Sequence, residues 1–387
     1  GLMSATASIL WTLPWIVPPA VALVRSRNSR SLDNASAVAP DPAPLVSVII
    51  PARNERRNIE RCVRSVLATR YPLLEVIVVN DHSTDETGAI ARAIARDDER
   101  LVVIDAPDLP DGWFGKQWAC ATGARVARGE LLLFTDADTR HEPDLLPRAV
   151  NALRDRGASL LSIAGHQEMH SFWERIVQPQ MFALLSVRYG GTEHVSNARR
   201  AEDVIANGQF ILVRRDAYDA VGGHAAVRDR VAEDMALGQE LFRIGRRVVL
   251  MLALRQLSTH MYASLREVVD GWRKNIFAGG RHAALGGRAG RSVYPALLLA
   301  IPVIGLAPPV SLLLAATGAL SAAWLVWSAI VVGISLLFWA AIYRFMGEPI
   351  AYALLYPLGL ATLLYIAAGA VFRGQRVEWK ERTYVAK

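Results

Sequence analysis

Two aspartates, Asp136 and Asp138, directly follow the hydrophobic run Leu131–Phe134. An apolar run of this kind is typical of a central parallel strand that is covered on both faces. The acids then lie at the carboxyl end of the strand, the edge where open α/β sheets bind their ligands. Two carboxylates this close repel each other unless a cation lies beside them. The pair therefore suggests a divalent metal ion and a phosphorylated substrate, although a strand end followed by a polar turn would have the same sequence.

Polar segments recur at other predicted strand ends. Pro51–Glu55 follows the strand Val46–Ile50, and Asp81 follows the strand Glu75–Val79. The pair Glu233-Asp234 opens a later helix, where the helix dipole alone favours acids. In combination these segments indicate one polar site at the carboxyl edge of a sheet.

Strands and helices alternate along the middle of the chain at the spacing of βαβ units. The predicted strands are Val46–Ile50, Glu75–Val79, Leu101–Ile104, Leu131–Phe134, Ser159–Ala164, Asn207–Val213 and Arg247–Leu252. The predicted helices are Arg57–Leu67, a segment ending near Arg96, Lys116–Arg128, Pro143–Arg156, Ser171–Tyr189 and Glu233–Ile244. This pattern predicts an α/β fold with a mostly parallel, doubly wound sheet and helices on both faces. Ser171–Tyr189 is interpreted as core or, preferably, as a helix on a membrane surface.

Several motifs occur in a recognisable order. They are VSVIIPARNE (46–55), VVNDHSTDET (78–87), GWFGKQWA (112–119), TDAD (135–138), NGQF (207–210), GGH (222–224), VAED (231–234) and WKERTY (379–384). Over residues 45–262 they resemble the family 2 glycosyltransferases with a GT-A fold. The resemblance is to the membrane-bound branch that includes hopanoid-associated and carotenoid glycosyltransferases, and more distantly to ceramide glucosyltransferase. It implies an inverting enzyme that uses a nucleotide-sugar donor, usually UDP-linked, and Mg²⁺ or Mn²⁺.

The resemblance also implies a role for each motif residue. Pro51, Arg53 and Glu55 would border the nucleotide, and Asp81 would accept a hydrogen bond from the base. Lys116 would lie near the base or the diphosphate. Asp136 and Asp138 would bind the nucleotide-sugar and its metal ion, and Asp234 would be the general base.

The chemistry of sugar transfer explains these residue types. The leaving diphosphate gains negative charge, which a hard cation held by carboxylates stabilises. The attacking hydroxyl must lose a proton, and one carboxylate within hydrogen-bond reach contributes about 10²–10⁴-fold as general base. Because no enzyme nucleophile is needed, the sugar configuration inverts.

The acceptor side departs from the family pattern. Processive synthases and ceramide glucosyltransferase carry a (Q/R)xxRW motif after the base, whereas the nearest segment here has Gly271 before Trp272. Trp272 could stack on an acceptor and Arg273 could contact the diphosphate, or both could be interfacial residues with a snorkelling cation. Glu233 and Gln209 are also assigned to the acceptor side. The departure argues against a processive polysaccharide synthase.

Composition indicates a membrane protein. Of the 387 residues 52% are hydrophobic, and the apolar residues concentrate after about Ser292, as expected for membrane helices following a globular domain. The net charge of +7 has no basic stripe with interleaved aromatics, which argues against nucleic-acid binding. It suits an anionic membrane surface or a diphosphate. Cys62 and Cys120 are predicted to be reduced thiols.

The predicted organisation begins with an uncleaved transmembrane anchor at 5–24, because three arginines follow it on the cytoplasmic side. The further predicted regions are a linker at 25–44, the catalytic domain at 45–262, interfacial helices at 263–293, a transmembrane region at 294–372 and a basic tail at 373–387. Three apolar stretches in 294–372 would put the basic tail outside the cell. A first stretch broken by its prolines would leave two spans and keep the tail inside, and the sequence does not choose between two and three.

These features together predict a multi-pass cell-membrane enzyme with a cytoplasmic catalytic domain and a lipid or lipid-linked acceptor. Transfer to a polyprenyl phosphate and synthesis of a polysaccharide are the alternatives. A catalytically silent nucleotide-binding scaffold is the alternative of another class. The presence of Asp136, Asp138 and Asp234 together argues against the scaffold.

Overall fold

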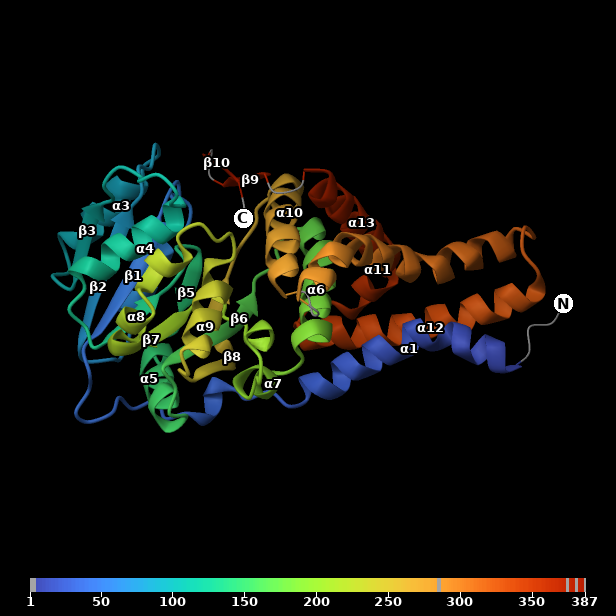
Figure 1. Ribbon diagram of the computed structural model, residues 1–387, viewed down its shortest axis with the longest axis horizontal. Helices are drawn as coiled ribbons and strands as arrows, with labels where there is room; N and C mark the ends of the chain where they lie inside the picture. The colour runs from blue at the N-terminus through green and yellow to red at the C-terminus, as the bar shows by residue number, and fades with distance from the viewer. Residues whose placement is uncertain (1–4, 284–286, 374–375, 380–381, 386–387) are drawn as a thin grey trace. The chain divides into compact units, whose positions relative to one another are not determined.

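The chain divides into two units, each described by itself. The computed structural model describes residues 5–283, 287–373, 376–379 and 382–385. A sheet unit is built from Ser29–Glu168, Thr192–Met261 and a short C-terminal hairpin, and a helical unit from the remaining described segments. Figure 1 shows the elements of both units with the labels used below.

The sheet unit contains an eight-stranded sheet in the order β3-β2-β1-β4-β7-β6-β8-β5. Its strands are β1 (Val46–Ala52), β2 (Leu74–Asn80), β3 (Leu101–Asp105), β4 (Leu131–Phe134), β5 (Thr139–His141), β6 (Leu160–Gln167), β7 (Ile211–Arg214) and β8 (Val248–Thr259). Strands β1 to β4 pair in parallel, whereas β7 is antiparallel to β4 and β6, and β5 is antiparallel to β8. The predicted α/β fold is therefore confirmed, with a parallel half and a mixed half.

Helices cover both faces of this sheet. They are α2 (Ile59–Leu67), α3 (Thr87–Ala95), α4 (Gly115–Val126), α5 (Leu145–Asp155), α7 (Thr192–Ser196), α8 (Arg215–Ala220) and α9 (Glu233–Arg243), with the 3₁₀ turns η1 (Leu32–Asn34), η2 (Ala201–Asp203) and η3 (Gly223–Val227). Alternate residues of β4 enter different cores, Leu133 on one face and Leu132 on the other. The unbroken apolar run of this strand follows from burial on both faces. The hairpin consists of β9 (Arg376–Trp379) and β10 (Arg382–Val385).

Two strands differ from prediction in ways that matter for the site. Strand β1 continues through Pro51, which was placed in the following turn. This is possible because β4 pairs with β1 only as far as Ile49, so that beyond this point β1 has one neighbour and the absent proline N–H breaks no ladder. The predicted strand Asn207–Val213 begins only at Ile211, and the residues before it form a turn.

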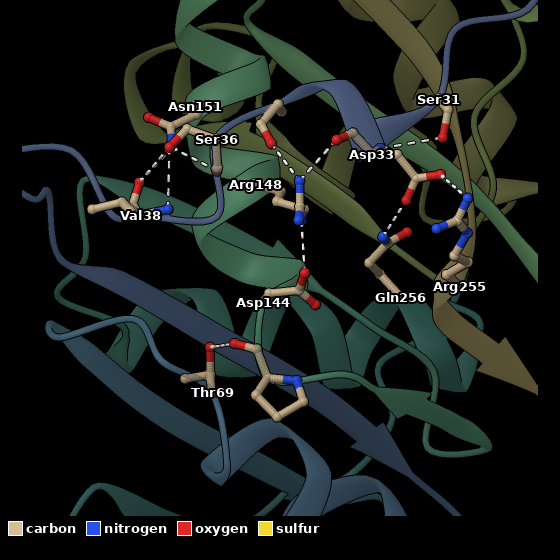
Figure 2. A network of polar contacts seen from close by, with 12 residues as sticks. Ser31, Asp33, Ser36, Val38, Thr69, Asp144, Arg148, Asn151, Arg255 and Gln256 are labelled. Atoms are coloured by element: carbon tan, nitrogen blue, oxygen red, sulfur yellow. Dashed lines mark hydrogen bonds and ion pairs between the residues drawn. The ribbon is translucent and has the colours of Figure 1, made fainter.

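The segment Ser29–Val38, called the strap below, packs against the sheet unit although its composition predicted a linker. Leu32 is completely buried, and the Leu252 N–H donates to the Arg30 carbonyl at 2.9 Å. Arg148 and Asn151 of α5 donate to backbone oxygens of the strap at Asp33, Ala35, Ser36 and Val38, as Figure 2 shows. The composition rich in Pro, Ala and Ser therefore belongs to an ordered segment, in which side chains satisfy the backbone polar groups.

The helical unit consists of α1 (Ala5–Ser26), α6 (Phe172–Tyr189), α10 (Leu265–Ala283), α11 (Gly287–Ala316), α12 (Ala322–Phe345), η4 (Ile350–Leu355) and α13 (Tyr356–Arg373). Three helical stretches, Ala289–Ala316, Ala322–Phe345 and Ile350–Phe372, are long and apolar enough to cross a membrane. Helix α6 belongs to this unit, although the predicted catalytic domain 45–262 included it. Its packing against α1, α10 and α13 accounts for its apolar surface. The N-terminal anchor stays a prediction.

Prolines do not break the helices of this unit. Helix α11 is continuous through its four prolines, whereas a first stretch broken by its prolines was one of the two alternatives that the sequence left open. A proline removes the hydrogen bond to the carbonyl four residues earlier. The carbonyl that Pro308 leaves open is that of Ile304, and it accepts from the Trp15 indole at 3.2 Å. The carbonyl that Pro179 leaves open in α6 is that of Arg175, which the Tyr343 hydroxyl of α12 reaches at 2.7 Å.

Candidate active site

Three strand ends meet at one edge of the sheet. The Asp81 N–H after β2 donates to Ala52 at the end of β1 at 2.8 Å, and the Thr135 N–H after β4 donates to Ile49 at 3.2 Å. The carboxyl edge of the parallel half therefore carries the turns that contain Arg53, Asp81 and Asp136. This is the position at which open α/β sheets bind ligands.

Lys116, in the first turn of α4, joins acids from two distant segments. Its Nζ lies 2.7 Å from Asp136 Oδ1 and 2.7 Å from Glu233 Oε1. Burial alone would lower the pKa of Lys116, but Asp136 and Glu233 outweigh burial and raise that pKa well above its ordinary value. The Lys116 and Asp136 side chains stay 24% and 29% exposed, so a ligand can reach both. The ammonium group thus links the acid pair after β4 to the acid pair that opens α9.

Asp234 is held by backbone donors. Its Oδ2 accepts from the Gly208 N–H at 2.7 Å, and its Oδ1 accepts from the Met235 N–H at 2.7 Å. A β-carbon at Gly208 would lie 3.0 Å from Lys116 Nζ and 3.2 Å from Asp234 Oδ2, so glycine allows this close approach. Burial, with a further contribution from Glu233, raises the pKa of Asp234 to about 6. A carboxylate with this pKa is ionised at neutral pH and still basic enough to take a proton.

Asp138 meets the requirements of a cation ligand. Its Oδ1 is buried and has no hydrogen-bond partner within the described part of the chain. Burial raises the pKa of Asp138 to about 8, and the charges of Asp136 and Glu55 add to this rise. A cation would favour the ionised form and satisfy the buried oxygen. Within residues 5–283 and 287–373, no set of three His, Cys, Asp or Glu side chains could hold a metal, so Asp136 and Asp138 would need ligands from a substrate or from water.

The predicted nucleotide-side residues lie in two adjoining turns. Arg53 Nη1 donates to the Asp81 carbonyl at 2.8 Å, and the Asp81 side chain is 2% exposed with its Oδ1 at 3.2 Å from His82 Nδ1. The Glu55 N–H donates to Thr87 Oγ1 at 2.7 Å, which fixes the turn after β1 against α3. Pro51 itself is a strand residue. The structure thus brings Arg53, Glu55 and Asp81 together at the sheet edge.

The predicted acceptor-side residues are distributed over both units. Glu233 lies in the site, paired with Lys116. Gln209 is buried, and its Oε1 accepts from Gln167 and Asn207 at 3.1 Å each, which argues against contact with a substrate.

Trp272 and Arg273 belong to the helical unit. The Trp272 ring is 5.9 Å from the Phe182 ring, and the Arg273 guanidinium lies 4.7 Å above the Tyr365 ring. Both contacts lie within the helical unit, and the acceptor-side role of the two residues stays a prediction. No role was predicted from the sequence for Gly208, Thr139 or His141. Of these three, only Gly208 lies in one of the motifs given above.

Part of the chain is similar to known glycosyltransferases. Residues 47–222 match the model of the family described as Glycosyl transferase family 2. The 4,4'-diaponeurosporenoate glycosyltransferase of Staphylococcus aureus (strain MRSA252) is 29% identical over 238 residues, covering 60% of this chain and 61% of that protein. The chain thus spans less than two thirds of the length of this curated relative.

A mannosyltransferase from Pyrobaculum calidifontis, solved in complex with GDP-Man and Mn²⁺, has a similar structure. The TM-score is 0.61 at 22% sequence identity, and the match covers 95% of this chain and 98% of that one. At this identity the likeness shows the fold, and the GT-A fold expected from the motifs is confirmed. Over residues 47–222 the chain therefore carries a domain that matches glycosyl transferase family 2.

Proposed function

We propose that the protein is a membrane-anchored inverting glycosyltransferase, which moves a sugar from a nucleotide-sugar to a lipid-borne acceptor with the aid of Mg²⁺ or Mn²⁺. The observation that carries this proposal is the double ion pair of Lys116 with Asp136 and Glu233. It joins a carboxylate pair suited to a metal–diphosphate group with a segment that presents a basic carboxylate. Both halves of a single displacement are therefore close to one ammonium group.

On the donor side, Asp136 and Asp138 would hold the cation, and the buried unpartnered oxygen of Asp138 supports this assignment. When bound, the cation stabilises the negative charge of the leaving diphosphate. Lys116 supplies a second positive charge at the same place. Asp81 would receive the base, and the Arg53 contact with its backbone would hold it in position. A uracil base is proposed, with guanine as the alternative because the mannosyltransferase binds GDP-Man.

On the acceptor side, Asp234 would take the proton of the attacking hydroxyl. A carboxylate has about four lone-pair positions, of which two accept from Gly208 and Met235 here. The remaining positions can accept from a hydroxyl without loss of either backbone bond. Glu233 would keep Lys116 in place rather than contact the acceptor.

A lipid acceptor is supported by two observations. Three helical stretches have the length and composition of membrane spans. The staphylococcal relative is named for a diaponeurosporenoate, an apolar carotenoid acid. We propose that the sheet unit lies on the cytoplasmic side, since Arg25 is in the last turn of α1 and Arg27 and Arg30 follow it.

The test is a transfer assay with the purified full chain in detergent and Mn²⁺. UDP-glucose and GDP-mannose are offered as donors, with retinol and retinoic acid as lipid probes carrying a hydroxyl or a carboxyl group. Products are read by mass spectrometry. Asp234→Asn is expected to abolish transfer to retinol while UDP still binds in calorimetry.

The matched control for this assay is Asp219→Asn, which changes an exposed acid on α8. It is expected to transfer at the rate of the unmodified chain. Unchanged turnover in Asp234→Asn would refute the base assignment. If calorimetry shows that Asp136→Ala and Asp138→Ala bind UDP with Mn²⁺ as tightly as the unmodified chain does, the metal site is refuted.

A further inference from the structure

A buried cluster of side chains lies beneath the acid pair after β4. It consists of Thr135, Thr139 and His141, which are at most 6% exposed. His141 Nε2 lies 3.0 Å from Thr135 Oγ1 and 3.2 Å from Thr139 Oγ1. The Thr135 hydroxyl also contacts the Gln209 carbonyl at 2.7 Å, and the Thr139 hydroxyl contacts the Asp136 carbonyl at 2.8 Å.

The protons of this cluster can be assigned by counting donors. A carbonyl oxygen can only accept, and we assign the one proton of each threonine hydroxyl to its carbonyl, which is nearer than the other hydroxyl at 3.0 Å. Both hydroxyl oxygens can then only accept from His141, which requires a proton on Nε2. Burial lowers the pKa of His141 to about 3, so the ring is neutral and Nδ1 carries no proton. With these assignments His141 is a donor to both threonines.

The two carbonyls at the ends of this cluster belong to the two halves of the site. The Asp136 carbonyl is part of the acid turn and also accepts from the Thr139 N–H at 3.3 Å. The Gln209 carbonyl directly follows Gly208, whose N–H holds Asp234. One imidazole N–H thus connects the proposed cation turn to the proposed general base through two hydroxyl groups.

We propose that His141 is a positioning residue, which through Thr139 and Thr135 sets the acid turn and the Gly208–Gln209 turn in register with each other. This inference rests on the proposed function, since it gives the two turns donor and acceptor roles. A residue of this kind touches no reacting atom. Its loss changes how accurately Asp136 and Asp234 are placed, and misplacement by about 1 Å can lower turnover by about 10²-fold.

The proposal predicts different effects for the two threonines of the cluster. Thr139→Val removes the hydroxyl donor to the Asp136 carbonyl, and we expect weaker Mn²⁺-dependent UDP binding, about tenfold, with a smaller loss of kcat. Thr135→Val releases the Gln209 carbonyl, and we expect an about 10- to 100-fold loss of kcat with donor KM unchanged. His141→Leu is expected to show both losses. Thr139→Ser, Thr135→Ser and His141→Gln keep the donors and should restore most of each loss.

The matched control is Thr317→Val, because the exposed Thr317 hydroxyl also contacts a backbone carbonyl, that of Leu314, at 3.0 Å, and belongs to the helical unit. It should leave kcat and KM unchanged. Each rate is divided by the amount of folded protein, which is measured by thermal unfolding. If Thr135→Val and Thr139→Val lose UDP binding and kcat to the same extent, or if the serine variants do not restore them, the proposal is overturned and the cluster has a structural role only.

A second measurement does not depend on the proposed reaction. Nitrogen-15 NMR of the histidine-labelled chain, with His141→Gln to assign the signal, reports the imidazole tautomer. We expect Nε2 protonated and Nδ1 bare from pH 5 to pH 8. A charged ring or the opposite tautomer would overturn the proposal. If the tautomer is as expected and no donor is used by the unmodified chain, the proposed function fails and not the hydrogen-bond arrangement.

Discussion

Replacing Lys116 with methionine removes the ammonium group that is ion-paired with Asp136 and Glu233 while keeping most of the side-chain volume. Asp136, Asp138, Glu233 and Asp234 then lose a shared positive charge. Like charges disfavour ionisation of their neighbours. We therefore expect the pKa of Asp234 to rise above its value of about 6, because the charge of Lys116 lowers it in the unmodified protein.

The size of this effect follows from distance. A β-carbon at Gly208 would lie 3.0 Å from Lys116 Nζ and 3.2 Å from Asp234 Oδ2, so these two atoms are at most about 6 Å apart. At an effective dielectric constant of about 20, two unit charges at ~6 Å interact by about 3 kcal/mol, or about two pKa units. Because the Lys116 side chain is 24% exposed, solvent screening reduces the shift to about one or two units.

The assay is the pH dependence of kcat with saturating donor and Mn²⁺. The acid limb for Lys116→Met should move upward by about one to two pH units, so that turnover at pH 7 falls about two- to tenfold and recovers above pH 9. Arg125→Met is the control, since it removes a cation from the same helix, where the guanidinium lies 4.5 Å above the Trp118 ring. An acid limb that stays in place in Lys116→Met would contradict the assigned coupling.

Three further changes test other parts of the structure. The folded-state pKa of Asp138, about 8, lies above its ordinary value of 3.8, so without metal the free energy of unfolding should fall as pH rises between these values. In urea titrations between pH 6.5 and 8, Asp138→Asn should show a smaller fall than the unmodified protein. Added Mn²⁺ should reverse the fall only in the unmodified protein. Gly208→Ala should push Asp234 aside and lower kcat by about 10- to 100-fold, with UDP binding by calorimetry retained. Tyr343→Phe leaves the Arg175 carbonyl without its hydroxyl donor and should cost about 1–3 kcal/mol, seen as a lower unfolding temperature in detergent.

The carboxyl-edge acids could be predicted because local sequence determines them. A strand buried on both faces has to be apolar, so the first polar residues after it mark its end, as at Asp81 and Asp136. The link to Asp234 came from a family motif and not from spacing. The structure adds Lys116 as the group that joins the two acid pairs, which no pattern in the sequence indicates.

The parts that were missed depend on pairing between distant segments. Strand β5 has three residues and forms only because it pairs with β8, so no periodicity identifies it. His141 and Thr139 lie on this strand. Gln209 was assigned to the acceptor side from its motif, yet its amide is buried against Gln167, and burial of a polar group against another cannot be read from one segment. The strap was interpreted as a linker for the same reason.

The open carbonyls beside the prolines of the helical unit have a consequence for synthesis. The donor for Arg175 is 168 residues away along the chain, and the donor for Ile304 is 289 residues away. Helix α6 therefore leaves the ribosome with an unmet acceptor, which stays unmet until α12 has been made. A chain that stops early, or a span that inserts in the wrong register, keeps a polar defect in an apolar environment. For the membrane protein proposed above, an unmet carbonyl of this kind would distinguish incomplete molecules from finished ones.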